Sequence, residues 1–376
     1  NPRRAPTEGT RVVMRKVGII GAGTMGSGIA IASAAHGCEV TIVDRSADAL
    51  ANAKSAAASF WGRAVAKGRM SAEEADAAGA RIAGAGNLAD LADRELVIEA
   101  VFEDFDLKAK VFGELGGVVP ADCVVATNTS CLKVSELAAH ISHPERFLGL
   151  HYFSPAQVNP IVEVVRGEQT APATFDAAMQ FCRDTGKTPL PCLDQYGFAI
   201  NRFFCPYTNE AARALDDGLG TTAEIDKVAQ EALGAAGGPF LVMNLIKPRV
   251  NLHAIQNLGP LGAFYAPAAS MTRVGEADQD WEIGEAGEIE PERFTAIADR
   301  LRRGMFLPAL QELDEDVAAP DVIDLGAREA LKIKHPPCAA MDGLGRDEVA
   351  RIIQPALDHF GIPAPASLER VGRLTA

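Results

Sequence analysis

The sequence has no long run of Lys and Arg, and its formal net charge at pH 7 is −14. Nucleic acid and anionic membrane surfaces attract basic patches, so neither is an expected partner. The seven cysteines form no C-x-x-C pair and the seven histidines have no metal-ligand spacing, so no metal site is expected. Cysteines within apolar runs are typical core residues of a reducing compartment, which favours a cytoplasmic protein.

What the chain does contain is the ordinary composition of a soluble globular enzyme. Hydrophobic residues make up 48% and charged residues 23% of its 376 residues. This length is enough for two or three modest domains. Residues 1–14, which carry Arg, Pro and Thr, are expected to form a disordered tail.

The stretch from Lys16 to Ser46 carries the clearest pattern. An apolar run, a glycine-rich turn, a helical segment and a second apolar run follow one another: Val17–Ile20, Gly21 with Gly23 and Gly26, Ile29–Ala35, and Val40–Val43. Two buried strands around a G-x-G-x-x-G turn and a helix form the unit that binds a dinucleotide. A membrane span is the alternative, but five glycines and two serines between 17 and 35 disfavour it.

Each glycine of this turn has a physical task. Gly21 allows the tight turn, Gly23 lets the backbone approach a pyrophosphate, and Gly26 lets the helix pack on the strand. Asp44 follows the second strand, where a carboxylate accepts hydrogen bonds from the adenosine ribose and repels a 2′-phosphate. NAD is therefore the predicted cofactor, although the neighbouring Arg45 weakens the case against NADP.

Apolar runs alternate with helical segments up to about residue 195. The expected strands are 96–101, 123–126, 147–152, 161–165 and 190–192; the expected helices are 46–70, one beginning at 71, and 103–115. This alternation predicts an α/β domain with a doubly wound, mostly parallel sheet. Ser130 and His151 fall at or near strand ends, where such sheets bind their ligands.

From Gly197 onward the pattern is helical, which predicts a second, all-α domain. Residues 202–243 align without gaps on residues 300–341 at an offset of 98 residues, with matching I-D and E-A-L segments. This match predicts an internal duplication. The segment 266–291 between the copies is expected to be a linker or surface loop. The predicted organisation is thus 15–195, 196–292 and 293–376 after the tail.

His151 and Glu163 are polar residues embedded in apolar, strand-like runs. A buried carboxylate is costly unless it is paired, and a neighbouring strand can bring it to the imidazole. A carboxylate on one ring nitrogen fixes the tautomer and raises the basicity of the other nitrogen. A dehydrogenase needs such a base to take a proton from a hydroxyl group. The alternative is a core histidine bonded to the backbone.

Several motifs together resemble the L-3-hydroxyacyl-CoA dehydrogenase family. They are G-A-G-T-M-G-S-G-I-A, V-I-E-A-V-F-E-D-F-D-L-K-A-K-V-F, T-N-T-S, G-L-H-Y-F-S-P, V-E-V-V-R-G and G-F-A-I-N-R, and they span about residues 15–245. The second helical copy resembles the repeated C-terminal domain of multifunctional fatty-acid oxidation enzymes. The resemblance implies a Rossmann-type domain and NAD-dependent oxidation of (S)-3-hydroxyacyl-CoA to 3-oxoacyl-CoA.

The resemblance also implies roles for individual residues. His151 would be the general base and Glu163 its orienting partner, while Ser130 would hold the 3-oxygen and Asn201 would lie close to the reacting groups. Without the resemblance, Ser130 would be interpreted as a strand-end turn and Asn201 as a helix N-cap. Glu103 and Lys108 would lie near the cofactor ribose. The full set expected to bind the cofactor is Gly21, Gly23, Thr24, Met25, Gly26, Asp44, Arg45, Glu103, Lys108 and Asn128.

Two departures concern the acyl-binding details. Ser154 stands where many family members have Asn, and the family's Gly/Lys-rich motif is not recognisable around 275–284. No segment resembles an enoyl-CoA hydratase, so a bifunctional enzyme is not expected. The candidates for binding the CoA tail are the basic residues Arg63, Lys67 and Arg69; the alternative is a solvated helix face. The competing functions are a dehydrogenase of a free hydroxy acid or sugar acid, and a non-catalytic NAD-binding relative.

The duplication also predicts how the chain assembles. In shorter family members, one helical unit packs against the same unit of a second subunit. A second copy within the chain, at 300–341, would take the place of that subunit. We therefore expect the family-type dimer interface to be internal, so that the protein is a monomer or a dimer through another surface.

Overall fold

The computed structural model describes residues 14–376 and divides into two compact units between Asp194 and Gln195. The predicted tail, residues 1–14, lies outside the described residues except for Met14, which is buried in the core of the first unit. The prediction of disorder is therefore wrong at this one residue, because its apolar side chain packs on the sheet.

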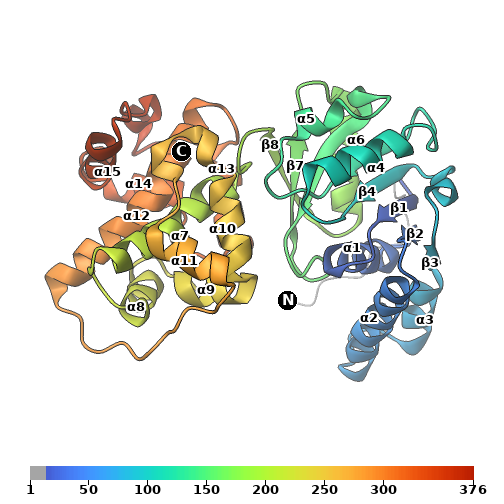
Figure 1. Cartoon of the computed structure of the whole chain (residues 1–376), viewed down its shortest axis with the longest axis horizontal. Helices are drawn as coiled ribbons and strands as arrows, with labels where there is room; N and C mark the ends of the chain where they lie inside the picture. Colours follow the sequence, from blue (N-terminus) through green and yellow to red (C-terminus); the bar gives the residue numbers. More distant parts are fainter. Residues whose placement is uncertain (1–13) are drawn as a thin grey trace. The chain divides into compact units, whose positions relative to one another are not determined.

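The first unit is an eight-stranded sheet with helices packed around it (Figure 1). The strands are β1 (Lys16–Ile20), β2 (Glu39–Val43), β3 (Ile82–Ala85), β4 (Leu96–Glu99), β5 (Val124–Thr127), β6 (Phe147–Tyr152), β7 (Ile161–Arg166) and β8 (Thr188–Leu193). The helices are α1 (Thr24–Ala35), α2 (Ala47–Ala66), α3 (Ala72–Ala80), α4 (Phe105–Leu115), α5 (Val134–Ala138) and α6 (Pro172–Asp184).

The strand order is β3-β2-β1-β4-β5-β6-β7-β8, and every neighbouring pair is parallel except β6 with β7. This confirms the predicted α/β class and its mostly parallel sheet. The order reverses at β1, so the carboxyl ends of β1 and β4 flank the crevice in which such sheets bind ligands. Helix α1 begins at Thr24, earlier than the predicted Ile29, because the glycine turn leads straight into it.

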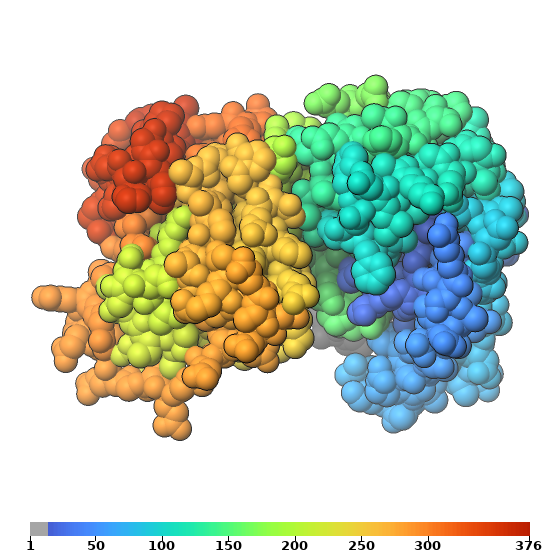
Figure 2. Space-filling model, in the orientation of Figure 1, coloured from blue at the N-terminus to red at the C-terminus, as the bar shows by residue number. Residues whose placement is uncertain are grey.

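The second unit is helical, as predicted. Its helices are α7 (Asn201–Asp216), α8 (Thr222–Ala232), α9 (Pro239–Ile246), α10 (Pro248–Gln256), α11 (Ala269–Ala277), α12 (Pro291–Asp314), α13 (Pro320–Glu329), α14 (Pro337–Leu344) and α15 (Arg346–Phe360). The predicted linker 266–291 is wrong in part, because α11 lies within it. From 278 to 290 the segment has neither helix nor strand and runs over the surface of this unit (Figure 2).

Corresponding hydrogen bonds in the two copies confirm the duplication. The Asp226 carboxylate accepts from the backbone N–H groups of Phe240 and Leu241, at 2.8 and 3.1 Å. Asp324, at the 98-residue offset, accepts in the same way from the backbone N–H groups of Cys338 and Ala339 in the first turn of α14, at 2.8 and 2.9 Å. Each carboxylate therefore satisfies the free N–H groups that begin a helix.

The copies meet around a local two-fold axis. Ala235 and Ile333, which correspond at the 98-residue offset, pair as an antiparallel bridge. Helices α7 and α12 cross where Gly304 faces Pro206, another corresponding pair, and a Cβ at Gly304 would lie 2.8 Å from the Pro206 carbonyl oxygen. Equivalent residues that touch one another are the signature of an isologous contact, here within one chain.

Candidate active site

The glycine turn that follows β1 forms a cradle for a dinucleotide. Gly21 has a φ of +107°, and a Cβ there would lie 2.6 Å from the Ala100 carbonyl oxygen. A Cβ on Gly26 would lie 1.9 Å from the Gly21 carbonyl oxygen, so the helix can approach the strand only without a side chain. At Gly23 an added Cβ meets no heavy atom within 4 Å. That space fits the pyrophosphate, which the N-terminus of α1 attracts.

A cavity of about 980 Å³ opens beside this turn. Its volume lies at the upper end of the usual range for small-molecule sites. Six of the residues predicted to bind the cofactor line the side of the cavity formed by β1, α1 and β2: Gly21, Gly23, Thr24, Met25, Asp44 and Arg45. The opposite wall comes from the end of β4 and from α4, including Phe102, Leu107, Lys110 and Val111.

These six residues, Gly21 through Arg45, are thus the part of the predicted cofactor set that the structure brings to the cavity. The other four members of that set, Gly26, Glu103, Lys108 and Asn128, are not among the residues that line it. Gly26 acts through the helix packing described above, and the remaining three have protein partners of their own.

Asp44 lies at the end of β2 and is held by the backbone. Its Oδ2 accepts from the Ala22 N–H and its Oδ1 from the Ser46 N–H, both at 2.8 Å. A carboxylate has about four acceptor positions, so two remain for the hydroxyl groups of a ribose. Arg45 beside it is exposed and lies 4.0 Å from the Glu114 carboxylate. That acidic neighbour reduces the attraction of Arg45 for a 2′-phosphate.

Lys108 is buried in an ion pair, with 1% of its side chain exposed. Its Nζ lies 2.6 Å from Glu99 Oε1 and 3.2 Å from Glu103 Oε2. Glu99 is wholly buried in β4, and its Oε2 accepts from the Thr127 hydroxyl at 2.7 Å. The ammonium group therefore links β4 and α4.

Glu103 fixes the loop that carries Ser130. Its Oε1 accepts from the Thr129 hydroxyl at 2.5 Å and from the Ser130 N–H at 2.8 Å. Burial raises the pKa of this carboxyl, but the charge of Lys108 and these hydrogen bonds outweigh burial, so that the net pKa is lowered. Glu103 is therefore ionised at neutral pH and holds the loop as an acceptor.

Asn128 connects the same loop to the next strand. Its Oδ1 accepts from the Tyr152 N–H at 2.8 Å, one residue beyond His151 in β6. The structure thus gives Asn128 a structural partner, and it fixes the end of β6 relative to β5.

His151 and Glu163 lie opposite each other on the antiparallel strands β6 and β7. The imidazole Nδ1 and Glu163 Oε2 are 2.6 Å apart, and the two residues are 6% and 0% exposed. An ionised carboxylate only accepts hydrogen bonds, so Nδ1 donates and Nε2 of the neutral ring is left as an acceptor. The pair is therefore built to take a proton at Nε2.

Two groups of predicted site residues are not among the residues that line the cavity at the glycine turn. Asn201 is the first residue of α7 and belongs to the second unit. The basic residues Arg63, Lys67 and Arg69 lie at the C-terminal end of α2 and just beyond it, where all three are exposed. They do not line the cavity at the glycine turn.

Glu99, Thr127 and Thr129 were not predicted from the sequence. They form hydrogen bonds that hold Lys108 and Glu103 in place. A signal for Glu99 was present, since a carboxylate in the apolar run of β4 needs a partner just as Glu163 does. Within residues 14–376 no cluster of His, Cys, Asp and Glu could hold a metal ion. None of the described helices is both long and apolar enough to cross a membrane.

Comparison with protein families gives matches to two models over most of the chain. A model described as "3-hydroxyacyl-CoA dehydrogenase, NAD binding domain" matches residues 16–195. A second, described as "3-hydroxyacyl-CoA dehydrogenase, C-terminal domain", matches residues 197–289.

Individual relatives agree with these models. A 3-hydroxybutyryl-CoA dehydrogenase of Bradyrhizobium diazoefficiens is 36% identical over 267 residues, which cover 70% of this chain and 91% of the relative. A 3-hydroxyadipyl-CoA dehydrogenase of Escherichia coli is 36% identical over 238 residues, which cover 63% of this chain but only 50% of the relative. The chain thus spans about half the length of that second protein.

Solved structures show the same fold. The crystal structure of a 3-hydroxybutyryl-CoA dehydrogenase from Escherichia coli superposes with a TM-score of 0.87 at 24% identity, covering 96% of this chain and 98% of the other. The (S)-3-hydroxybutyryl-CoA dehydrogenase of Ralstonia eutropha gives a TM-score of 0.70 at 33% identity, covering 72% of this chain and all of the other. The first likeness includes both helical copies and concerns the fold alone.

Proposed function

Because the chain belongs to the 3-hydroxyacyl-CoA dehydrogenase family, we propose that it oxidises (S)-3-hydroxyacyl-CoA to 3-oxoacyl-CoA with NAD. The observation that carries this proposal is the buried pair of His151 and Glu163, 2.6 Å apart. It lies in the same unit as the glycine turn and its cavity of about 980 Å³. A base and a dinucleotide site are the two parts that oxidation of an alcohol requires.

In this mechanism, His151 accepts the proton of the substrate's 3-hydroxyl group at Nε2. Bound NAD supplies the acceptor for the hydride that leaves the same carbon. Glu163 holds the ring through Nδ1, and its negative charge stabilises the imidazolium that forms. In the reverse direction, the same Nε2 returns the proton to the ketone oxygen.

Ser130 would hold the 3-oxygen of the substrate through its hydroxyl group. A neutral donor suits an oxygen that changes between alcohol and ketone, because it stabilises both states. Glu103 supports this role by fixing the Ser130 backbone, at 2.8 Å from its N–H. Asn201, at the start of α7, would contribute a second neutral donor.

The CoA tail would contact the basic residues Arg63, Lys67 and Arg69. Their support is that they are exposed and concentrate positive charge in a protein of net charge −14. Phosphate groups of CoA are attracted by such a cluster. A solvated helix face remains the competing interpretation of these three residues.

We further propose that the protein acts in the cytoplasm and needs no partner subunit at its helical unit. The seven cysteines are buried and form no disulfide among the described residues, as suits a reducing compartment. The contact between α7 and α12, which joins the two copies, supports an interface that is satisfied within the chain.

The proposal is tested by following NADH formation from (S)-3-hydroxybutyryl-CoA and NAD. We expect turnover with this enantiomer and little with the (R)-enantiomer or with NADP. Turnover of a free hydroxy acid alone would identify a related dehydrogenase. Tight NADH binding without turnover of any hydroxy compound would identify a non-catalytic relative.

A further inference from the structure

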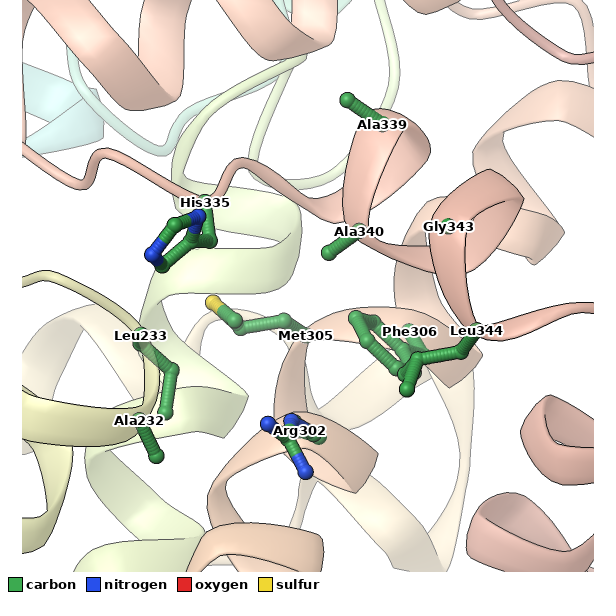
Figure 3. Close-up of a pocket in the computed structure, with 10 residues that line it drawn as sticks. All are labelled: Ala232, Leu233, Arg302, Met305, Phe306, His335, Ala339, Ala340, Gly343 and Leu344. Atoms are coloured by element: carbon green, nitrogen blue, oxygen red, sulfur yellow. The ribbon is translucent and has the colours of Figure 1, made fainter.

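A second cavity, of about 350 Å³, lies within the helical unit and plays no part in the reaction proposed above. Both copies of the repeat contribute to it (Figure 3). Its lining residues are Ala232, Leu233, Arg302, Met305, Phe306, His335, Ala339, Ala340, Gly343 and Leu344. The volume is at the small end of the range for small-molecule sites.

The repeat explains why the cavity exists. Helix α14 faces the cavity with three small residues, Ala339, Ala340 and Gly343. The residues of α9 at the corresponding positions, 98 residues earlier, are all larger: Leu241, Val242 and Leu245. The second copy therefore carries less side-chain volume at these three positions than the first copy does. A Cβ added at Gly343 would meet no heavy atom within 4 Å.

The lining combines apolar side chains with the guanidinium group of Arg302, which can form a further ion pair. Leu233, Met305 and Phe306 are buried apolar residues. Among the described residues the one ion-pair partner of Arg302 is Asp299, at 3.7 Å, which is beyond hydrogen-bond length. The other oxygen of that carboxylate accepts from Arg351 at 2.6 Å. The Arg302 guanidinium therefore keeps donors for an anion.

We propose that this cavity binds a medium-chain aliphatic carboxylate. The hydrocarbon chain packs against Met305 and Phe306, and the carboxylate receives hydrogen bonds from Arg302. A guanidinium group matches a carboxylate because its parallel N–H groups reach both oxygens. His335 lies at the same cavity and supplies a second polar group near its edge. This site is independent of the proposed reaction.

The test is isothermal titration calorimetry of the full chain with sodium octanoate as the probe. A ligand of this size is expected to bind with a dissociation constant of about 1 mM or tighter. Gly343→Leu restores the residue type of the first copy, and it should abolish binding because it fills the cavity. Gly62→Leu, an identical change at an exposed helical position with no atom near its Cβ, is the matched control and should leave binding unchanged.

Arg302→Met tests the class of ligand. It should weaken octanoate binding by about tenfold or more, the effect of losing a charge-assisted contact, and leave 1-octanol binding unchanged. Thermal unfolding shows whether each variant is folded, and Ala340→Val carries the same test if Gly343→Leu does not fold. Absence of saturable binding, or binding that survives both filling variants, would overturn the proposed site. If Arg302→Met lowered the affinity for octanoate and for octanol equally, the claim that Arg302 binds the carboxylate group of the ligand would be overturned.

Discussion

Replacing Lys108 by Met removes the ammonium group that lies between the carboxylates of Glu99 and Glu103. The distances of 2.6 and 3.2 Å and the 1% exposure of the lysine make this a buried pair. Removing one partner of a buried pair costs about 3–5 kcal/mol, because the other charge is left without compensation. The unfolding free energy of a domain is only about 5–15 kcal/mol, so Lys108→Met should lose a large part of it.

The assay is urea unfolding followed by circular dichroism, for the wild type, the single variants and the double variant. Glu99→Gln combined with Lys108→Met removes the more deeply buried of the two carboxylate charges that Lys108→Met leaves without compensation, so the double variant should be more stable than Lys108→Met alone. We expect a coupling energy of about 0.5–3 kcal/mol between the two sites. A loss of less than about 1 kcal/mol of unfolding free energy in Lys108→Met would refute this reasoning. So would a double variant whose loss equals the sum of the losses in the two single variants.

Five other substitutions test the remaining parts of the account. His151→Ala should lower turnover by about 10²–10⁴-fold, the usual contribution of a general base, while NADH binding persists; Glu163→Gln should also lower turnover, and full activity in either variant would place the base elsewhere. Asp44→Ala should narrow the preference for NAD over NADP, measured as the ratio of dissociation constants; equal affinities in the wild type would contradict this. Lys67→Glu should raise KM for acetoacetyl-CoA and leave KM for a pantetheine thioester unchanged. Equal changes in KM for the two substrates would indicate that the basic end of α2 is a solvated helix face that does not bind CoA. Burial raises the pKa of Asp226 to about 6 despite two backbone donors, so the free energy of unfolding should fall by up to about 3 kcal/mol as pH rises from about 4 to about 6. Asp226→Asn should remove this dependence of the free energy of unfolding on pH. An unchanged slope in the variant would contradict the raised pKa of Asp226.

Local patterns allowed much of the fold to be predicted from the sequence. The glycine turn, the strand before it and Asp44 after the second strand are close in sequence, and their spacing reflects the geometry of one supersecondary unit. The internal repeat was visible for a similar reason, because Asp226 and Asp324 recur with the helices that they cap.

The contacts that assemble the site were harder to predict. The apolar runs of β6 and β7 have the same appearance in parallel and antiparallel strands, so the sequence did not determine the register that places His151 opposite Glu163. The family resemblance placed Lys108 near the cofactor ribose, but the ion pair of Lys108 with Glu99 was not predicted. Its burial depends on how α4 folds back on β4, which no local pattern records.

The second cavity could not be predicted either, although the residues that create it are visible in the alignment of the two copies. Gly343 of the second copy stands where the first copy has Leu245, so the second copy has less side-chain volume at this position. Whether neighbouring side chains fill that volume depends on Phe306 and Leu233, which come from different copies.

The most direct test of the central claim is the initial rate of NADH oxidation with acetoacetyl-CoA, compared with the rate with free acetoacetate. The account predicts that the wild-type chain reduces the CoA thioester and has little activity on the free acid, and that His151→Ala loses the activity on the thioester. Equal rates with the two compounds, or a thioester rate that does not depend on His151, would contradict it.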